Sequence, residues 1–168
     1  MYGWTKEQTD EFLLMAVKLC ADLKINAVAG PVMSGAVMAS SIATAASHVG
    51  MGVTAILLDK PILDGKVNYR PTKHSGGIKQ LYLLTSGTEL RIMLVDDVVS
   101  SGLSMGHAIA EIQRGFVTST IVAAVSGNGW YNSIGKLMKD KVPGIRLFSS
   151  CGKYGSLREF EIGKPINI

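Results

Sequence analysis

The chain has 168 residues, a common length for a single domain, and 47% of them are hydrophobic against 18% charged, which excludes an intrinsically disordered protein. Its formal net charge of +4 favours anionic partners, but the basic residues are scattered along the sequence. A phosphate-rich small ligand accounts for the charge as well as nucleic acid does, and we do not expect nucleic-acid binding. No run reaches the ~20 apolar residues of a membrane-spanning helix and the N-terminus is polar, so we expect a soluble, cytoplasmic protein with no membrane partner.

The first part of the chain predicts two helices and two strands. Thr5 and Gln8 form a capping-box pattern before an amphipathic helix whose apolar residues continue to Leu23. A short strand over 25–29 leads into a turn, and the small-residue segment 36–49 predicts a tightly packed helix. Residues 53–58 predict the next strand.

The turn after the first strand is a candidate anion site. It reads Gly30-Pro31-Val32-Met33-Ser34-Gly35. A glycine-containing turn between a strand end and a helix N-terminus directs backbone N–H groups and the positive end of the helix dipole at a bound anion. Gly-Pro and Ser-Gly also occur as plain turn residues, and the pattern alone leaves both interpretations open.

The stretch from about 59 to 80 is polar, rich in glycine and proline, and without periodicity. About twenty residues of this kind are unusual in a compact domain unless they form a functional loop. A solvated surface loop is the alternative. Residues 81–85 predict a further strand, which Ser86-Gly87 turns into the next run in a pattern compatible with a hairpin.

The stretch from Arg91 to Met105 carries the strongest chemical pattern. Arg91 is followed by a continuous apolar run that ends at Val95. Such a run is typical of a strand buried on both faces of a parallel sheet. Asp96 and Asp97 stand where this strand ends. Their carboxylates are suited to accept hydrogen bonds from a sugar diol, or to hold a divalent cation through its water molecules.

The loop after the two aspartates is a second candidate phosphate site. It contains small and hydroxyl residues and leads into an apolar-periodic helix: Ser100, Ser101, Gly102, Leu103 and Ser104. Backbone N–H groups at the helix N-terminus and the serine hydroxyls can donate to a phosphate, and the glycine allows close approach or a positive φ. A ligand that fits both features has a phosphate group on one side, for the loop, and adjacent hydroxyls on the other, for the two carboxylates. A ribose 5-phosphate is such a ligand.

The remaining elements continue the alternation of strand and helix. We expect a helix from about 104 to the Arg114-Gly115 pair, a strand over 120–125, a helix over 132–139 and a strand over 145–149, whereas 152–168 shows no clear period. Trp130 and Tyr131 follow a strand end, where an aromatic ring could stack on a base or fix the next helix to the core. Cys20 and Cys151 have no metal-ligand spacing, which favours buried free thiols over a disulfide.

These elements predict a single α/β domain over 1–168, with a doubly wound, mainly parallel sheet flanked by helices. A receiver-type domain also places acidic residues at a strand end, but near its first strand. Here the pair follows a late strand and precedes a hydroxyl and glycine loop, which disfavours that alternative.

Residues Ile92 to Ser104 resemble, without a gap, the phosphoribosyl-diphosphate (PRPP) signature of type I phosphoribosyltransferases: four apolar residues, two acids, two apolar residues, and a hydroxyl-rich loop with glycine. The resemblance implies a pentosyltransferase of nucleotide metabolism that moves the ribose 5-phosphate group between PRPP and a nucleobase and releases pyrophosphate, with Mg²⁺ as its cofactor. A non-catalytic PRPP- or nucleotide-binding regulator is the alternative, because some relatives are regulators.

The resemblance also implies a role for each candidate residue. Asp96 and Asp97 would bind the ribose hydroxyls and, through water, the metal, and residues 100–104 would bind the 5-phosphate. The turn from Gly30 to Gly35 would bind pyrophosphate. The stretch 59–80 would be a mobile loop that supplies the cationic or proton-donating side chains Lys60, Lys73 and His74.

The same loops are most similar to the orotate branch of the family. The similarity lies in the Gly-Pro opening, the glycine four residues after Pro31, and Lys73-His74 before a glycine pair. The chain departs from many orotate enzymes at Met33 and Ser34, where they carry an aromatic residue and a lysine. Ser100 stands where enzymes for 6-oxopurines carry a base-contacting aspartate, which disfavours hypoxanthine or guanine and leaves a pyrimidine or orotate-like base favoured.

Family members also carry a small hood over the base and usually form dimers. Segments of about 1–24 and 151–168 are available for a hood in this chain. The resemblance therefore implies a small hood built from terminal segments and a homodimer.

Overall fold

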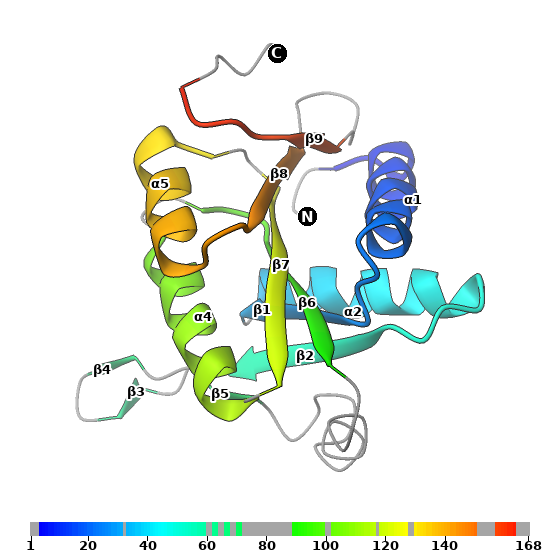
Figure 1. The fold of residues 1–168 in the computed structure, drawn as a ribbon. Coiled ribbons are helices and arrows are strands. Elements are labelled where there is room, and N and C mark those ends of the chain that lie inside the picture. Colours follow the sequence, from blue (N-terminus) through cyan, green and yellow to red (C-terminus); the bar gives the residue numbers. More distant parts are fainter. Residues whose placement is uncertain are drawn as a thin grey trace.

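The computed structural model describes residues 4–31, 33–59, 62–63, 66–67, 70–71, 89–99, 102–116, 118–127, 130–150 and 157–163. Within these residues the main sheet has seven strands in the order β5-β2-β1-β6-β7-β8-β9 (Figure 1). The five central strands are parallel to one another: β2 (Thr54–Asp59), β1 (Ala27–Pro31), β6 (Leu90–Asp96), β7 (Ser119–Ser126) and β8 (Arg146–Ser150). The predicted doubly wound, mainly parallel α/β fold is confirmed.

Both edges of the sheet are short antiparallel strands that the sequence did not predict. At one edge β5 (Arg70–Pro71) pairs with the end of β2, and at the other β9 (Leu157–Glu159) pairs with β8. Two- and three-residue strands are too short to show a period, which explains why 59–80 and 152–168 looked irregular in the sequence. The two-residue strands β3 (Ile62–Leu63) and β4 (Lys66–Val67) pair antiparallel and form a separate small sheet.

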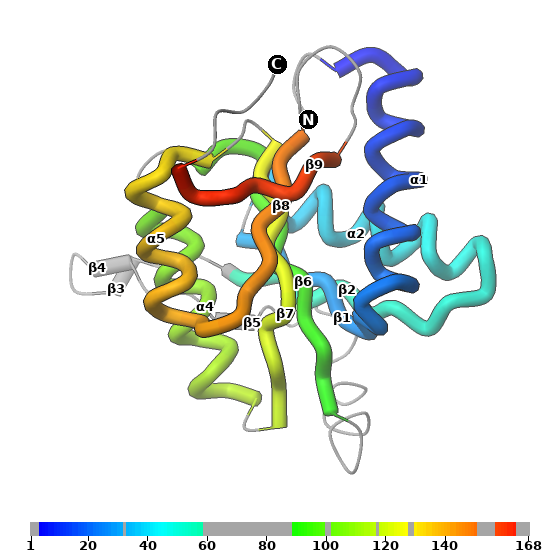
Figure 2. The backbone as a smooth tube through the Cα atoms, turned by 45° about the horizontal axis from the view of Figure 1, so that its top comes forward, coloured from blue at the N-terminus to red at the C-terminus, as the bar shows by residue number. Residues whose placement is uncertain are grey.

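Helices cover both faces of the sheet (Figure 2). The first face is covered by α1 (Lys6–Asp22) and α2 (Ser34–His48), and the second by α4 (Leu103–Gly115) and α5 (Asn132–Lys141). The central strand β6 contributes to both cores, since Ile92 and Leu94 join one cluster and Met93 and Val95 the other. This two-sided burial is the reason for its uninterrupted apolar sequence.

The capping box predicted at Thr5 is formed. The Thr5 hydroxyl accepts from the Gln8 N–H at 3.2 Å, and the Gln8 side-chain oxygen accepts from the Thr5 N–H at 2.8 Å. At the other end of α1, the Leu23 carbonyl accepts from the Arg91 guanidinium at 3.0 and 3.2 Å. The arginine at the second position of β6 therefore fixes the end of α1 to the sheet.

The strand β9 is held by one arginine on the neighbouring strand. Arg146 donates to Glu159 at 2.8 Å, and its guanidinium lies 5.2 Å from the centre of the Phe148 ring. The Leu157 N–H also lies 3.2 Å from the sulfur of Met15 on α1. These contacts join the described part of the C-terminal segment to β8 and α1, and the hood expected from the terminal segments stays a prediction.

The prediction for the two cysteines is tested in part, and the prediction of a strand over 81–85 is not tested. Cys20 is a buried free thiol, as predicted, whereas Cys151 and the predicted strand 81–85 lie outside the described residues. Among the described residues, each helix is too short or too polar to cross a lipid bilayer.

The capping box gives a first test of the fold. We expect Thr5→Ala to lower the free energy of unfolding by about 1 kcal/mol, because the N–H groups of the first turn lose their side-chain acceptor. Thr9→Ala, one turn further along α1, is the matched control, since alanine favours a helix interior and no cap is lost. Urea unfolding of both variants measures the difference, and an equal loss in both would contradict a capping role.

Burial of Cys20 gives a second test. Burial raises the pKa of the Cys20 thiol to about 12, so almost none of it is thiolate at mildly alkaline pH. In a Cys151→Ser background, we expect Cys20 to resist a thiol-specific disulfide reagent in the folded protein and to react at once in denaturant. Rapid reaction in the native state would place Cys20 at the surface.

Candidate functional site

The candidate site lies at the carboxyl edge of the three central strands. Because β1, β6 and β7 are adjacent and parallel, Pro31, Asp96 and Ser126 end them at the same edge of the sheet. Helix α2 starts directly after β1, and α4 starts after the loop that follows β6 (Figure 1). Loops at this edge form the ligand crevice of open α/β sheets, so the fold brings both predicted anion sites to the usual place.

The connection between β1 and α2 is tighter than the sequence predicted. Gly30 and Pro31 belong to β1, and Ser34 and Gly35 belong to α2. Only positions 32 and 33 of the expected six-residue turn therefore lie between the strand and the helix. A Cβ atom on Gly30 would lie 2.0 Å from the Gly35 carbonyl oxygen. The first turn of α2 therefore rests on the end of β1, at a distance that only glycine allows at position 30.

Gly35 brings the same helix end against β6. A Cβ atom on Gly35 would lie 2.6 Å from the Val95 carbonyl oxygen and 3.3 Å from Oδ1 of Asp96. The Asp96 carboxylate is thus placed beside the N-terminus of α2, where the helix dipole favours negative charge. Asp96 is buried, and its Oδ1 accepts from the Asp97 N–H at 3.0 Å.

The end of β7 contacts the second aspartate. The Gly127 N–H donates to the Asp96 carbonyl at 2.9 Å, and a Cβ atom on Gly127 would lie 2.8 Å from the Asp97 carbonyl oxygen. Sequence reasoning did not assign Gly127 a role. The Ser-Gly pair directly after a buried strand was the one available indication, and it is shared with ordinary turns.

The N-terminus of α4 is built around Gly102. This residue is the N-cap, with φ 72° and ψ −2°, which confirms the positive φ considered from the sequence. A Cβ atom there would lie 2.8 Å from a methyl carbon of Ile134 on α5. The backbone conformation and the close approach both require glycine.

The start of α4 also corrects one predicted boundary. Leu103, expected in the loop, is the first residue of the helix, and its side chain is 64% exposed, whereas Ser104 is half-buried. The N-cap residue Gly102 has no side chain to cap this helix end, and the first turn contains no acidic residue. A helix N-terminus of this composition favours an anion.

Several predicted site residues lie outside the part of the chain that the structure describes. They are Val32, Lys60, Lys73, His74, Ser100 and Ser101. Of the remaining turn residues, Met33 is 81% exposed and Ser34 is half-buried. The roles expected for all of these residues stay predictions.

The two aromatic residues after β7 have different environments. Trp130 is buried, and its indole N–H donates to the Phe148 carbonyl at 2.7 Å, so it fixes the start of α5 to the core. Tyr131, at the N-cap of α5, is 63% exposed. Of the two expectations for these residues, the structural one holds for Trp130, and Tyr131 is the residue whose ring is available to a ligand.

The chemistry of the two carboxylates fits a magnesium ion. Among the described residues there is no group of three or more His, Cys, Asp or Glu side chains that could hold a metal by themselves. Mg²⁺ is commonly held by one or two carboxylates together with water and substrate phosphates, and oxygen donors are the ligands it prefers. Asp96 and Asp97 meet this requirement without a third protein ligand.

Comparison with known proteins gives the fold its class. No protein-family model and no curated protein sequence matches the chain. Solved structures do match. Adenine phosphoribosyltransferase from Thermoanaerobacter pseudethanolicus superposes with a TM-score of 0.56 at 13% identity, over 84% of this chain and 77% of that chain. Orotate phosphoribosyltransferase from Aeropyrum pernix gives 0.52 at 20% identity, over 84% and 68%.

A third similar structure is a hypothetical protein from Neisseria gonorrhoeae with bound ppGpp, with a TM-score of 0.50 at 15% identity, over 89% of this chain and 80% of that chain. The chain therefore has the fold of the type I phosphoribosyltransferases. Adenine and orotate enzymes match about equally well, so the fold does not single out the orotate branch.

The contact of Gly35 with β6 gives a third test. We expect Gly35→Ala to lower the free energy of unfolding by about 1–3 kcal/mol, because the added methyl group meets the Val95 backbone and the helix must shift. Gly52→Ala is the control, since no atom lies within 4 Å of a Cβ atom there. Urea unfolding compares the two, and equal stabilities would show that α2 moves away from β6 without cost.

Proposed function

We propose that the chain is a phosphoribosyltransferase that transfers the ribose 5-phosphate group between PRPP and a nucleobase, with release of pyrophosphate, in cytoplasmic nucleotide metabolism. One observation carries the proposal: Asp96 ends β6 beside the N-terminus of α2, Asp97 follows it, and the chain after them leads to the N-terminus of α4. The fold shared with adenine and orotate phosphoribosyltransferases is additional support.

Two helix N-termini around two carboxylates match the shape of PRPP. PRPP carries a phosphate at one side of its ribose and a pyrophosphate at the other, with two hydroxyls between them. Neither α2 nor α4 has an acidic residue in its first turn, and neither N-cap residue, Met33 or Gly102, makes a side-chain cap, so both helix ends favour phosphate groups. The aspartates would accept hydrogen bonds from the hydroxyls.

Electrostatic repulsion at the proposed pyrophosphate site favours a bound magnesium ion. The Asp96 carboxylate lies at the same helix end as the proposed pyrophosphate site, so two anions would share one positive dipole. When bound, Mg²⁺ supplies the positive charge that offsets their repulsion and stabilises the leaving pyrophosphate. Asp96 and Asp97 are the residues that would hold it, through its water molecules.

The protein's own contribution to the reaction is position and charge. The base nitrogen attacks the anomeric carbon of the ribose while the bond to pyrophosphate breaks, through an oxocarbenium-like state. The residues at the two helix ends would fix the ribose and both phosphate groups, and Lys60, Lys73 and His74 would add positive charge and a proton donor when the loop closes. Closure would also exclude water, which otherwise hydrolyses the same bond.

A pyrimidine or orotate-like base remains the preferred acceptor. The loop patterns around Pro31 and His74 support it, and Ser100 lacks the carboxylate that would recognise a 6-oxopurine. The Tyr131 ring is exposed at the N-cap of α5, in the segment that follows β7, and it is a candidate to stack on a base of either class.

A nucleotide-binding regulator without catalysis is the second candidate. A specific observation favours it: the Neisseria gonorrhoeae protein of similar fold has ppGpp bound. Like PRPP, ppGpp carries phosphate groups on two sides of a ribose. Two helix N-termini would therefore suit either ligand.

Calorimetric titration of PRPP with Mg²⁺ tests the shared core of both candidates. We expect saturable binding by the parent chain, binding weakened about tenfold or more by Asp97→Asn, and none by Asp96→Asn/Asp97→Asn, because hydrogen bonds to charged groups are lost. Asp140→Asn on the exposed face of α5 is the control and should bind as the parent does. Urea unfolding verifies that each variant is folded, and absence of binding by the folded parent would reject the proposal.

A panel of bases then separates enzyme from regulator. We expect pyrophosphate release with PRPP, Mg²⁺ and a pyrimidine such as orotate, and little or none with hypoxanthine or guanine. Binding of PRPP without turnover on any base, together with saturable binding of ppGpp, would favour the regulator. Turnover on adenine alone would keep the enzyme and overturn the preference for a pyrimidine.

A further inference from the structure

The two aspartates that follow the apolar run of β6 use their carboxylates differently. Asp96 is buried, and its Oδ1 accepts from the Asp97 N–H at 3.0 Å. Asp97 is half-buried, and among the described residues no hydrogen bond or ion pair to its carboxylate is present. The Asp97 carboxylate is therefore available to a ligand, whereas one oxygen of Asp96 already holds the backbone of its neighbour.

The peptide group between the two aspartates is held at both of its polar ends. Its N–H, which belongs to Asp97, donates to Oδ1 of Asp96. Its carbonyl, which belongs to Asp96, accepts from the Gly127 N–H at 2.9 Å. The backbone on the N-terminal side of Asp97 is therefore fixed by one contact within its own segment and by one contact from the residue after β7.

Gly127 also contacts the backbone of Asp97 itself. A Cβ atom on Gly127 would lie 2.8 Å from the Asp97 carbonyl oxygen and 3.1 Å from the Asp97 Cα atom. A methyl group at this position would therefore displace the backbone. Gly127 is not among the described glycines with a positive φ, so alanine could adopt its backbone conformation, and it is the contact with Asp97 that requires glycine.

The register of the sheet brings Gly127 and Asp97 together. Strands β6 and β7 are parallel neighbours, and Asp96 is paired with Ser126. The next residue of each segment, Asp97 and Gly127, therefore follows at the same level of the sheet. The contact between them is thus a property of the fold and exists before any ligand binds.

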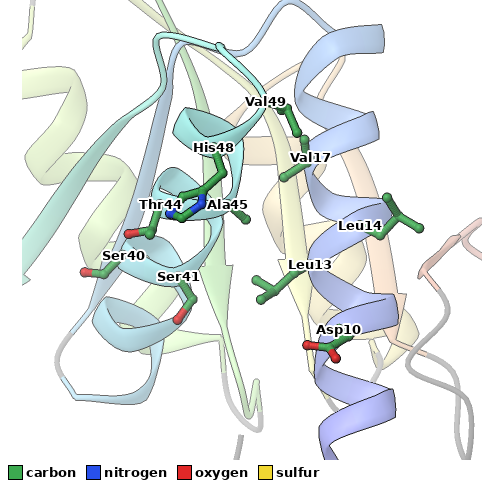
Figure 3. A pocket seen from close by; sticks show the side chains of 10 residues that line it. All are labelled: Asp10, Leu13, Leu14, Val17, Ser40, Ser41, Thr44, Ala45, His48 and Val49. Atoms are coloured by element: carbon green, nitrogen blue, oxygen red, sulfur yellow. The ribbon is translucent and has the colours of Figure 1, made fainter.

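The groove shown in Figure 3 lies outside this arrangement. It separates α1 from α2, has a volume of about 630 Å³ and is lined by side chains of these two helices and of Val49. None of the residues assigned to the candidate site is among them. The described contacts that support the aspartates therefore come from the strand and helix ends around them.

We propose that Gly127 is a positioning residue, which holds the Asp97 backbone so that the Asp97 carboxylate is oriented for the hydroxyls of the ligand before the ligand binds. The recognition of a ribose rests on the proposed function, whereas the contact between Gly127 and Asp97 does not. A carboxylate that is already oriented loses little freedom when it accepts hydrogen bonds, so more of the interaction free energy contributes to affinity.

A double-mutant cycle on PRPP affinity tests whether Gly127 acts through Asp97. We expect Gly127→Ala to weaken binding of PRPP with Mg²⁺ about tenfold, because the methyl group displaces the Asp97 backbone, and to have little further effect in Asp97→Asn. Gly115→Ala is the matched control, since the described residues leave a Cβ atom there without a neighbour within 4 Å. Urea unfolding verifies that each variant is folded. Losses that add in the double variant would overturn the proposal.

The carbon NMR resonance of the Asp97 carboxyl group tests the contact without a ligand. Its loss in Asp97→Asn identifies it. We expect Gly127→Ala to move this resonance and Gly115→Ala to leave it in place, and an unmoved resonance in Gly127→Ala would overturn the proposal. A resonance that moves in a protein that does not bind PRPP rejects the proposed function alone, whereas PRPP binding with additive losses rejects the positioning role alone.

Amide hydrogen exchange of the parent chain keeps the proposal testable if Gly127→Ala does not fold. We expect the Gly127 N–H to be protected in the free protein, because it donates to the Asp96 carbonyl before a ligand is present. Rapid exchange of this N–H in the free protein would contradict a contact that the fold supplies. Protection that appears only after PRPP is added would show that the ligand orders the contact, which also overturns the proposal.

Discussion

The close approach of α2 to the ends of β1 and β6 is the contact on which the candidate site depends. Gly30 leaves room for the first turn of α2, and Gly35 lets that turn reach the backbone of Val95. A side chain at either position would separate the helix N-terminus from Asp96, and the carboxylate and the dipole would no longer act at one place. The site is therefore set by backbone distances that two glycines allow, before any side chain contributes chemistry.

The sheet supplies the second condition. Because β6 is covered on both faces, its side chains are committed to the two cores, and the chain can present polar groups only where the strand ends. Asp96 and Asp97 occupy that point, and β7 supports them through Gly127. The central position of β6 thus gives the carboxylates a rigid support, while Gly102, with its positive φ, forms the N-cap of α4.

Local sequence patterns predicted most of this arrangement. The capping box, the apolar run of β6 and the glycine and hydroxyl pattern up to Ser104 are all signals within a few residues, and the fold and the place of the aspartates followed from them. The contact of Gly127 with Asp97 and that of Gly102 with Ile134 were not predictable, because each joins segments distant in sequence. The edge strands β5 and β9 were missed for another reason: two or three residues are too few to form a pattern.

The edges of the sheet have a consequence for how the molecule meets other copies of itself. An open strand edge is a template for continuous pairing and aggregation. At one edge β5 ends in Pro71, which has no N–H to donate, and at the other β9 exposes Arg158 and Glu159 over a length of three residues. Both ends of the sheet thus resist the addition of a further strand. Within the described residues, an edge of this kind is a poor template for the continuous strand pairing that builds fibres.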